Sequence, residues 1–109
     1  MKQIPLSMGL FALVSDQDYK ELSQHKWSVS FGSHSGQKPY ARRYCYKSKK
    51  RILMHRQIMG FPEGLVVDHL NDNSLDNRRS NLEAVTVGEN TRRHYARNGK
   101  KRRKKGSKR

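Results

Sequence analysis

The sequence contains one cysteine, three prolines and no long apolar run. The single cysteine, Cys45, excludes an intrachain disulfide and any zinc site built from several cysteines, so we expect packing alone to hold the scaffold, without structural zinc. No stretch approaches the ~20 apolar residues that a membrane-spanning helix needs. Residues 1–5 also lack the apolar region of a secretory signal, and a cytoplasmic location is the expectation that fits these absences.

Acidic residues are scarce as well. Nine Asp or Glu stand against 24 Lys or Arg, which gives a net charge of +15 and indicates a polyanionic partner. Residues 100–109 hold eight Lys or Arg and no acid, which leaves +7 for the first 99 residues. Such a segment cannot bury a core, and we expect it to stay disordered until it meets phosphate. A merely solvated tail and a nuclear-localisation signal are the alternatives to DNA binding.

At 109 residues, a third of them hydrophobic, the chain has room for one domain with a modest core. We predict an α+β fold: a small antiparallel sheet with short helices in residues 1–60, a second unit in residues 61–97, and the basic tail of residues 98–109. The elements expected in the first region are a helix over 15–23, a strand over 27–31, a turn over 32–38, a strand over 40–47, an extended stretch over 51–53 and a helix over 54–59.

Three tyrosines alternate along the second of these strands. Tyr40, Tyr44 and Tyr46 fall on one face together with Arg42, because successive side chains of a strand point to opposite sides. The sheet could therefore lie along a DNA groove through a basic face. Equally, the tyrosines could form its core while the charges are solvated.

Two strands and a polar loop are expected further along the chain. Residues 65–67 form a short, β-branched apolar run, which predicts a strand that leads into Asp68 and His69. The next eleven residues, 70–80, are rich in Asn, Asp and Ser, which indicates a compact loop. Residues 82–85 alternate between apolar and polar side chains and predict a second strand with one buried face.

A helix should follow these strands. Thr86 and Glu89 have the spacing of a capping box, in which the first residue caps the helix and the second is its third residue. The helix is expected over residues 87–97 and should stop at Asn98 and Gly99. The end of the first strand and the first turn of this helix are the places where Asp68, His69 and Asn90 could converge.

Residues 66–90 (VVDHLNDNSLDNRRSNLEAVTVGEN) resemble the HNH, or ββα-metal, endonucleases. The similarity is to the phage and intron-encoded branch, in which asparagine replaces the last histidine of the name. Residues 54–59 are similar to the short helix that leads into this motif. Residues 11–14 and 16–19, followed by Lys26 and Trp27, are similar to the N-terminal part of phage HNH proteins. The resemblance spans roughly residues 4 to 93.

The resemblance implies a role for each site residue. His69 would be the general base that takes a proton from the attacking water, and its ordinary pKa near ~6.5 leaves it mostly neutral at pH 7. Asp68 and Asn90 would bind one divalent cation, for which Mg²⁺ or Mn²⁺ suits oxygen ligands that few protein groups supply. Asn81 would orient the imidazole. Products would carry 5′-phosphate and 3′-hydroxyl ends.

The same residues have structural explanations. A histidine after a strand can be a hydrogen-bonded structural group, Asp68 can pair with an arginine, Asn81 can close the loop through backbone bonds, and Asn90 can lie on the helix surface. The residues of the loop itself, Asn71, Asp72, Asn73, Asp76 and Asn77, are interpreted as loop formers rather than ligands.

The expected substrate is double-stranded DNA, cut by a monomer that nicks or by a DNA-bound dimer. The candidate phosphate contacts are Arg56, Arg78, Arg79, Arg92, Arg93, Lys100, Lys101, Arg102 and Arg103. The alternative is a noncatalytic nucleic-acid-binding protein, either a decayed HNH domain or a ribosome-associated factor. The intact pair of Asp68 and His69 favours the enzyme.

Overall fold

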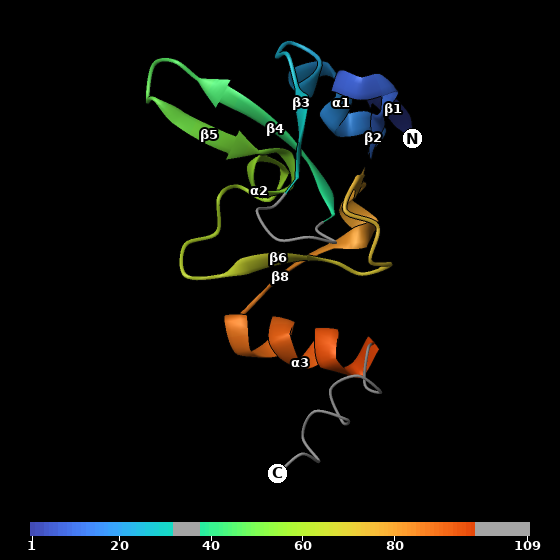
Figure 1. The fold of residues 1–109 in the computed structure, drawn as a ribbon, viewed down its shortest axis with the longest axis vertical. Coiled ribbons are helices and arrows are strands. Elements are labelled where there is room, and N and C mark those ends of the chain that lie inside the picture. The colour runs from blue at the N-terminus through green and yellow to red at the C-terminus, as the bar shows by residue number, and fades with distance from the viewer. Residues whose placement is uncertain (32–37, 98–109) are drawn as a thin grey trace.

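The computed structural model describes residues 1–31 and 38–97 of the chain, which form an α+β fold (Figure 1). The turn predicted over 32–38 lies, except for Lys38, outside the described residues, as does the tail after Arg97 with its four candidate contacts. No helix in the described part of the chain has the length and apolar character needed to cross a membrane.

The first sheet was not anticipated from the sequence. Strands β1 (Lys2–Pro5) and β2 (Phe11–Val14) pair antiparallel, and a 3₁₀ turn at Ser7–Gly9 joins them. The third strand, β7 (Asp76–Asn77), comes from the predicted loop of residues 70–80 and pairs parallel with β2. The N-terminal hairpin therefore supports that loop directly.

The second sheet confirms most of the predicted N-terminal elements. It contains β3 (Ser28–Phe31), β4 (Pro39–Cys45) and β5 (Lys50–Leu53) in sequential antiparallel order. Helix α1 (Asp16–Leu22) precedes this sheet, and α2 (Met54–Ile58) follows it and ends before Gly60, whose φ of +78° suits a residue without a side chain.

The strand–loop–strand–helix order predicted for the second region is confirmed. Strand β6 (Val66–His69) pairs antiparallel with β8 (Leu82–Val85), and α3 (Val87–Arg97) follows at once. The Glu89 N–H donates to Thr86 Oγ1 at 3.0 Å, which is the first half of the predicted capping box. Helix α3 lies beside the β6–β8 hairpin (Figure 1).

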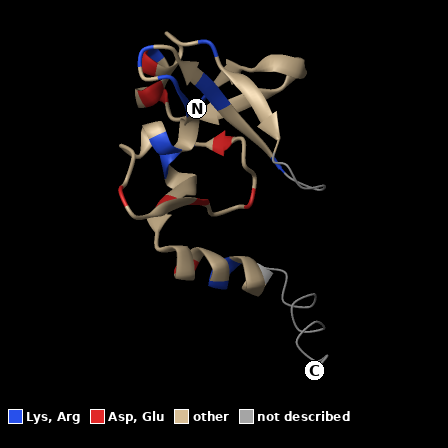
Figure 2. Ribbon diagram, turned by 60° about the vertical axis from the view of Figure 1, so that its left-hand side comes forward, with Lys and Arg blue, Asp and Glu red and all other residues tan. Residues whose placement is uncertain are grey.

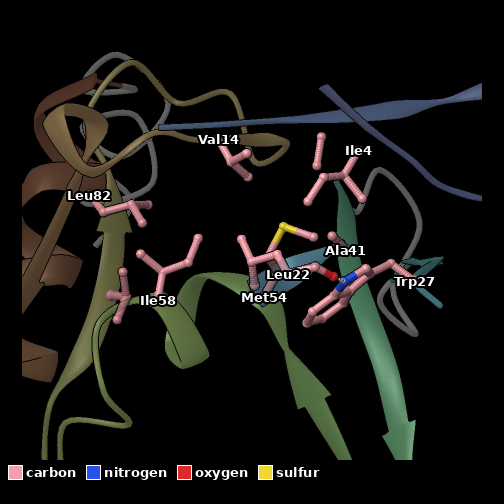
Figure 3. Packing of buried hydrophobic residues seen from close by; sticks show 10 residues of the cluster. Ile4, Val14, Leu22, Trp27, Ala41, Met54, Ile58 and Leu82 are labelled. Atoms are coloured by element: carbon pink, nitrogen blue, oxygen red, sulfur yellow. Dashed lines mark hydrogen bonds between the residues drawn. The ribbon is translucent and has the colours of Figure 1, made fainter. Parts of the chain in front are cut away.

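One hydrophobic core joins the two regions. Its buried residues are Ile4, Ala12, Val14, Leu22, Trp27, Ala41, Met54, Ile58, Val67 and Leu82 (Figure 3). Members from β1, β2, α1, β4 and α2 thus pack against members from β6 and β8. The Trp27 indole N–H donates to the carbonyl of Leu22 at 2.8 Å, so its buried polar atom is satisfied.

The three tyrosines of the second sheet have different environments. Tyr40 is half-buried, and its ring centroid lies 5.6 Å from that of His55 and 6.0 Å from that of His69. Tyr44 and Tyr46 are exposed, with ring centroids 4.8 Å apart. The interpretation of all three as core is therefore wrong for Tyr44 and Tyr46.

Candidate active site

A polar pocket lies where β4, β6 and α3 meet. It is lined by Lys38, Tyr40, Val67, Asp68, His69, Asp72, Ser74, Asn90 and His94. The structure thus brings together Asp68, His69 and Asn90, as the sequence predicted. The cavity volume is about 70 Å³, which exceeds what a single water molecule needs.

His69 ends strand β6 with its imidazole largely buried. Its Nε2 lies 2.8 Å from the Oδ1 carbonyl oxygen of Asn77, so Nε2 carries the proton and donates it to this bond. The lone pair of the neutral ring is therefore on Nδ1. Burial lowers the pKa of His69 below its ordinary value, against the opposing effects of the Asn77 hydrogen bond and the Asp68 charge. A neutral imidazole that can accept a proton follows from this environment.

Asn77 is a site residue that the sequence interpretation did not find. It lies in β7 opposite Val14 of β2 and is fully buried. Its Nδ2 is the one buried side-chain nitrogen or oxygen in the described residues that has no hydrogen-bond partner. An unsatisfied buried donor costs about 1–3 kcal/mol, so Asn77 carries this cost at one end of its amide while the other end binds His69.

Asn81, predicted to orient the imidazole, holds the loop instead. Its Oδ1 accepts from the backbone N–H of Asn71 at 2.9 Å, and its Nδ2 donates to Asn71 Oδ1 and to the carbonyl of Asp76, both at 2.9 Å. These bonds fix the chain two residues after His69 and one residue before Asn77. Asn81 thus supports both partners of the imidazole bond, whereas the bond itself is made by Asn77.

Asp68 is buried at the pocket and is bound to an arginine of α3. Its Oδ2 accepts from Arg93 Nη1 at 3.1 Å. The alternative in which Asp68 pairs with an arginine is thus observed, and the carboxylate also lines the pocket.

The donor set of the pocket fits a hard divalent cation. Asp68 supplies a carboxylate and Asn90 an amide, and such oxygen donors suit Mg²⁺ or Mn²⁺, which retain several waters. His94 is an exposed residue one turn after Asn90 on α3, and it lines the same pocket. The four-residue spacing from Asn90 was the available signal. Among the described residues, no three His, Cys, Asp or Glu side chains gather into a metal-binding group.

Two aromatic groups pack behind the imidazole of His69. The His55 ring of α2 meets it edge to face, with centroids 4.9 Å apart, and Tyr40 contacts both rings. Burial, followed by the charges of His69 and Arg56, lowers the pKa of His55 to about 3. The imidazole of His55 is therefore neutral in the folded protein near neutral pH.

The second sheet also reaches the pocket, through the start of β4. Lys38 Nζ forms an ion pair with the Asp72 carboxylate, and its Nζ also donates to the Asp72 carbonyl at 3.2 Å. Next to it, Ser74 Oγ donates to the carbonyl of Pro39. The start of β4 is thus fastened to the loop that follows His69.

The described arginines among the candidate phosphate contacts all have partners within the chain. Arg78 forms two hydrogen bonds with Asp76 at 2.7 and 2.6 Å, and Arg79 pairs with Asp18 at 2.7 Å. Arg56 donates to the carbonyls of Leu65 and Pro62 at 3.0 and 2.9 Å, while Arg92 and Arg93 are paired with carboxylates on or near α3. Acidic and basic positions lie close together along the α3 ribbon (Figure 2). In the protein without DNA, these side chains therefore connect loops and helices of the same chain.

The comparison with protein families agrees with this geometry. Residues 49–92 match the HNH endonuclease family, and the matched segment runs from the β4–β5 turn into the first turns of α3. It covers 44 of the 109 residues and includes Asp68, His69, Asn77 and Asn90. No curated protein and no solved structure matches the chain. The match supports the HNH family for this segment, and with it a nuclease that acts on nucleic acid.

Proposed function

We propose that this protein is an HNH endonuclease that hydrolyses phosphodiester bonds of double-stranded DNA with the help of one divalent cation. The observation that carries the proposal is the imidazole of His69. Its Nε2 is held by Asn77, and it lines one pocket with Asp68 and Asn90. A structural histidine would have no need of a buried carboxylate and an amide beside its ring in an open polar pocket.

His69 acts in this proposal as the general base. Because Nε2 donates to Asn77, Nδ1 accepts the proton of the attacking water, and the imidazolium that results is stabilised by the Asn77 carbonyl and the neighbouring Asp68 charge. Asn77 thereby fixes the tautomer and the ring orientation. The neutral rings of His55 and Tyr40 restrict the motion of the imidazole and keep water from that side.

Asp68 and Asn90 would hold the cation, with His94 as a further donor on the same side of α3. When bound, a divalent cation supplies charge stabilisation at the scissile phosphate and at the departing 3′ oxygen. Mg²⁺ or Mn²⁺ suits these donors. The expected products carry 5′-phosphate and 3′-hydroxyl ends.

The surface that holds the DNA is proposed to be the β4–β5 hairpin, residues 39–53. This segment has six Lys or Arg and no Asp or Glu. Lys47, Lys49, Lys50 and Arg51 are exposed at its turn, and within the described residues none of the four forms an ion pair. Duplex DNA is a polyanion that such unpaired cations bind.

Aromatic groups on and beside the hairpin also support DNA binding at this surface. Exposed Tyr44 and Tyr46 line a surface groove together with Lys26 and Arg43, and the Arg43 guanidinium lies 5.5 Å from the centroid of the Trp27 ring. The turn of the hairpin projects from the rest of the fold (Figure 1). We therefore propose that this hairpin and the basic tail bind DNA, in place of the arginines of the motif that are paired within the chain.

One site per chain implies nicking by a monomer or a double-strand cut by a DNA-bound dimer. The asparagine at position 90 supports the phage and intron-encoded branch of the family, and the bacterial or phage-infected cytoplasm is the proposed setting.

The proposal is tested with supercoiled plasmid, incubated with Mg²⁺ or Mn²⁺ and, separately, with EDTA. The parent protein should relax or linearise the plasmid only with the metal. His69→Ala should reduce the rate by roughly 10²–10⁴-fold with nearly unchanged DNA affinity. Gln17→Ala, at an exposed residue of α1 that lines neither the pocket nor the groove beside the hairpin, is the control. Metal-independent DNA binding without cleavage by the parent would instead support a noncatalytic DNA-binding protein.

A further inference from the structure

Arg93 is bound by three carboxylates at once. Each of its three nitrogens goes to a different acid: Nη1 to Asp68 Oδ2 at 3.1 Å, Nη2 to Glu83 Oε1 at 3.0 Å and Nε to Glu89 Oε2 at 3.1 Å. The side chain is about three-quarters buried, with 26% exposed. This arginine therefore connects α3 with both strands of the β6–β8 hairpin.

The strand register explains why a cation is needed at this position. Asp68 and Glu83 are direct neighbours across β6 and β8. Like charges directly opposite one another in an antiparallel pair are destabilising. The Asp68 carboxylate is also almost fully buried, with 3% exposed, and an isolated buried charge is strongly unfavourable. Arg93 neutralises the repulsion and supplies the counter-charge.

Within the described residues, the ion pairs of this cluster join three carboxylates, those of Asp68, Glu83 and Glu89, to two guanidinium groups, since Arg92 also binds Glu89 at 2.6 Å. Arg93 is also held by Glu83 and Glu89, so it keeps two partners when its hold on Asp68 loosens.

We propose that Arg93 substitutes for the divalent cation as the counter-charge of Asp68, and that it lowers the affinity of the site for that cation. The inference rests on the proposed function, because it concerns the same carboxylate. With Arg93 bound to Asp68, the buried acid is compensated before any metal arrives, and the fold does not depend on metal. A divalent cation at Asp68 must share the carboxylate with Arg93 or displace it.

The test measures Mn²⁺ binding to the full chain by isothermal titration calorimetry and by the effect of Mn²⁺ on the unfolding temperature. The variants are Arg93→Met, which removes the charge, and Arg93→Lys, which keeps the charge but cannot bind three carboxylates. Arg79→Met is the matched control, because it also removes one arginine and one ion pair, with Asp18 on α1. Asp68→Asn in each background identifies binding at this carboxylate.

Arg93→Met should bind Mn²⁺ roughly ten-fold or more tightly than the parent, because one unit charge a few ångströms from the cation is removed. Its unfolding temperature should be lower without metal and should rise more on addition of Mn²⁺. Arg93→Lys should lie between Arg93→Met and the parent, and Arg79→Met should match the parent. Asp68→Asn should remove the gain.

Equal or weaker Mn²⁺ binding by Arg93→Met would overturn the inference and leave the proposed metal site standing, provided that the parent binds Mn²⁺ saturably. Absence of saturable binding in both would overturn the inference together with the metal-dependent function. If Arg93→Met does not fold without metal, recovery of its circular dichroism on addition of Mn²⁺ supports the inference. Without such recovery, the Mn²⁺ affinity of Arg93→Lys is the deciding measurement. An affinity equal to that of the parent overturns the inference.

Discussion

The buried imidazole of His55 should make the protein sensitive to acid. His55 is 7% exposed, and its pKa is lowered to about 3, mainly by burial. In the unfolded chain the same group has its ordinary pKa near ~6.5. Below that pH the unfolded state binds a proton that the folded state does not, so the free energy of unfolding falls as the pH is lowered from about 6.5 towards 3.

The size of the effect follows from the two pKa values. At pH 5 the unfolded-state pKa lies about 1.5 units above the pH, which corresponds to a loss of about 2 kcal/mol. This is a large share of the ~5–15 kcal/mol that stabilises a typical domain. His69, whose pKa is also lowered by burial, adds to the loss in the same direction.

The experiment is urea unfolding from pH 7.5 to pH 5, followed by the fluorescence of Trp27, the only tryptophan and a buried one. His55→Phe retains a ring for packing against His69 and Tyr40 but binds no proton. The parent should lose about 2 kcal/mol more than His55→Phe over this range, with Gln17→Ala, at an exposed residue of α1, as the control that should behave as the parent. Identical pH dependence in the parent and in His55→Phe would refute the reasoning.

Further predictions concern the site and the DNA surface. Asn77→Leu should slow plasmid cleavage roughly 10–100-fold, because the imidazole of His69 loses its hydrogen-bond acceptor. Its stability in urea should change little, because the unsatisfied Nδ2 is removed while Nε2 of His69 loses its partner. A cleavage rate equal to the parent's would disprove the role. Replacing the four cations of residues 47–51 by Ala should weaken duplex binding and flatten its salt dependence by about four phosphate contacts, whereas Arg79→Ala should change the salt slope little; the opposite ranking would move the DNA surface back to the motif. Deleting residues 98–109 should lower affinity about equally for all sequences while cleavage at low salt continues, and an unchanged salt slope would show that the tail does not touch DNA.

The part of the fold that local signals determine was predictable. Alternation gave the strand over residues 82–85, and the capping pair of Thr86 and Glu89 gave the start of a helix that runs over 87–97 as expected. These signals depend on residues a few positions apart, so they can be recognised without knowledge of the tertiary structure. The convergence of the strand end and the helix start on one pocket followed from the same order of elements.

The hydrogen-bond partner of His69 could not be found in that way. Asn77 belongs to a two-residue strand that exists because it pairs with β2, more than sixty residues earlier in the chain. Neither β1 nor β2 was predicted, so the loop had no visible support, and Asn77 was interpreted as one of several loop formers. Similarly, the contact of Arg93 with Asp68 depends on how α3 lies against the β6–β8 hairpin, which residue spacing does not specify.

The pairing of β7 with β2 has a consequence for how such a motif is engineered. The strand that carries the partner of His69 is the outer member of a sheet whose other strands begin the polypeptide. A fragment of residues 49–92 would therefore lack the strand that supports the hydrogen-bond partner of His69. Transplanting the motif to a new host protein should succeed only with a surrogate strand for Phe11–Val14.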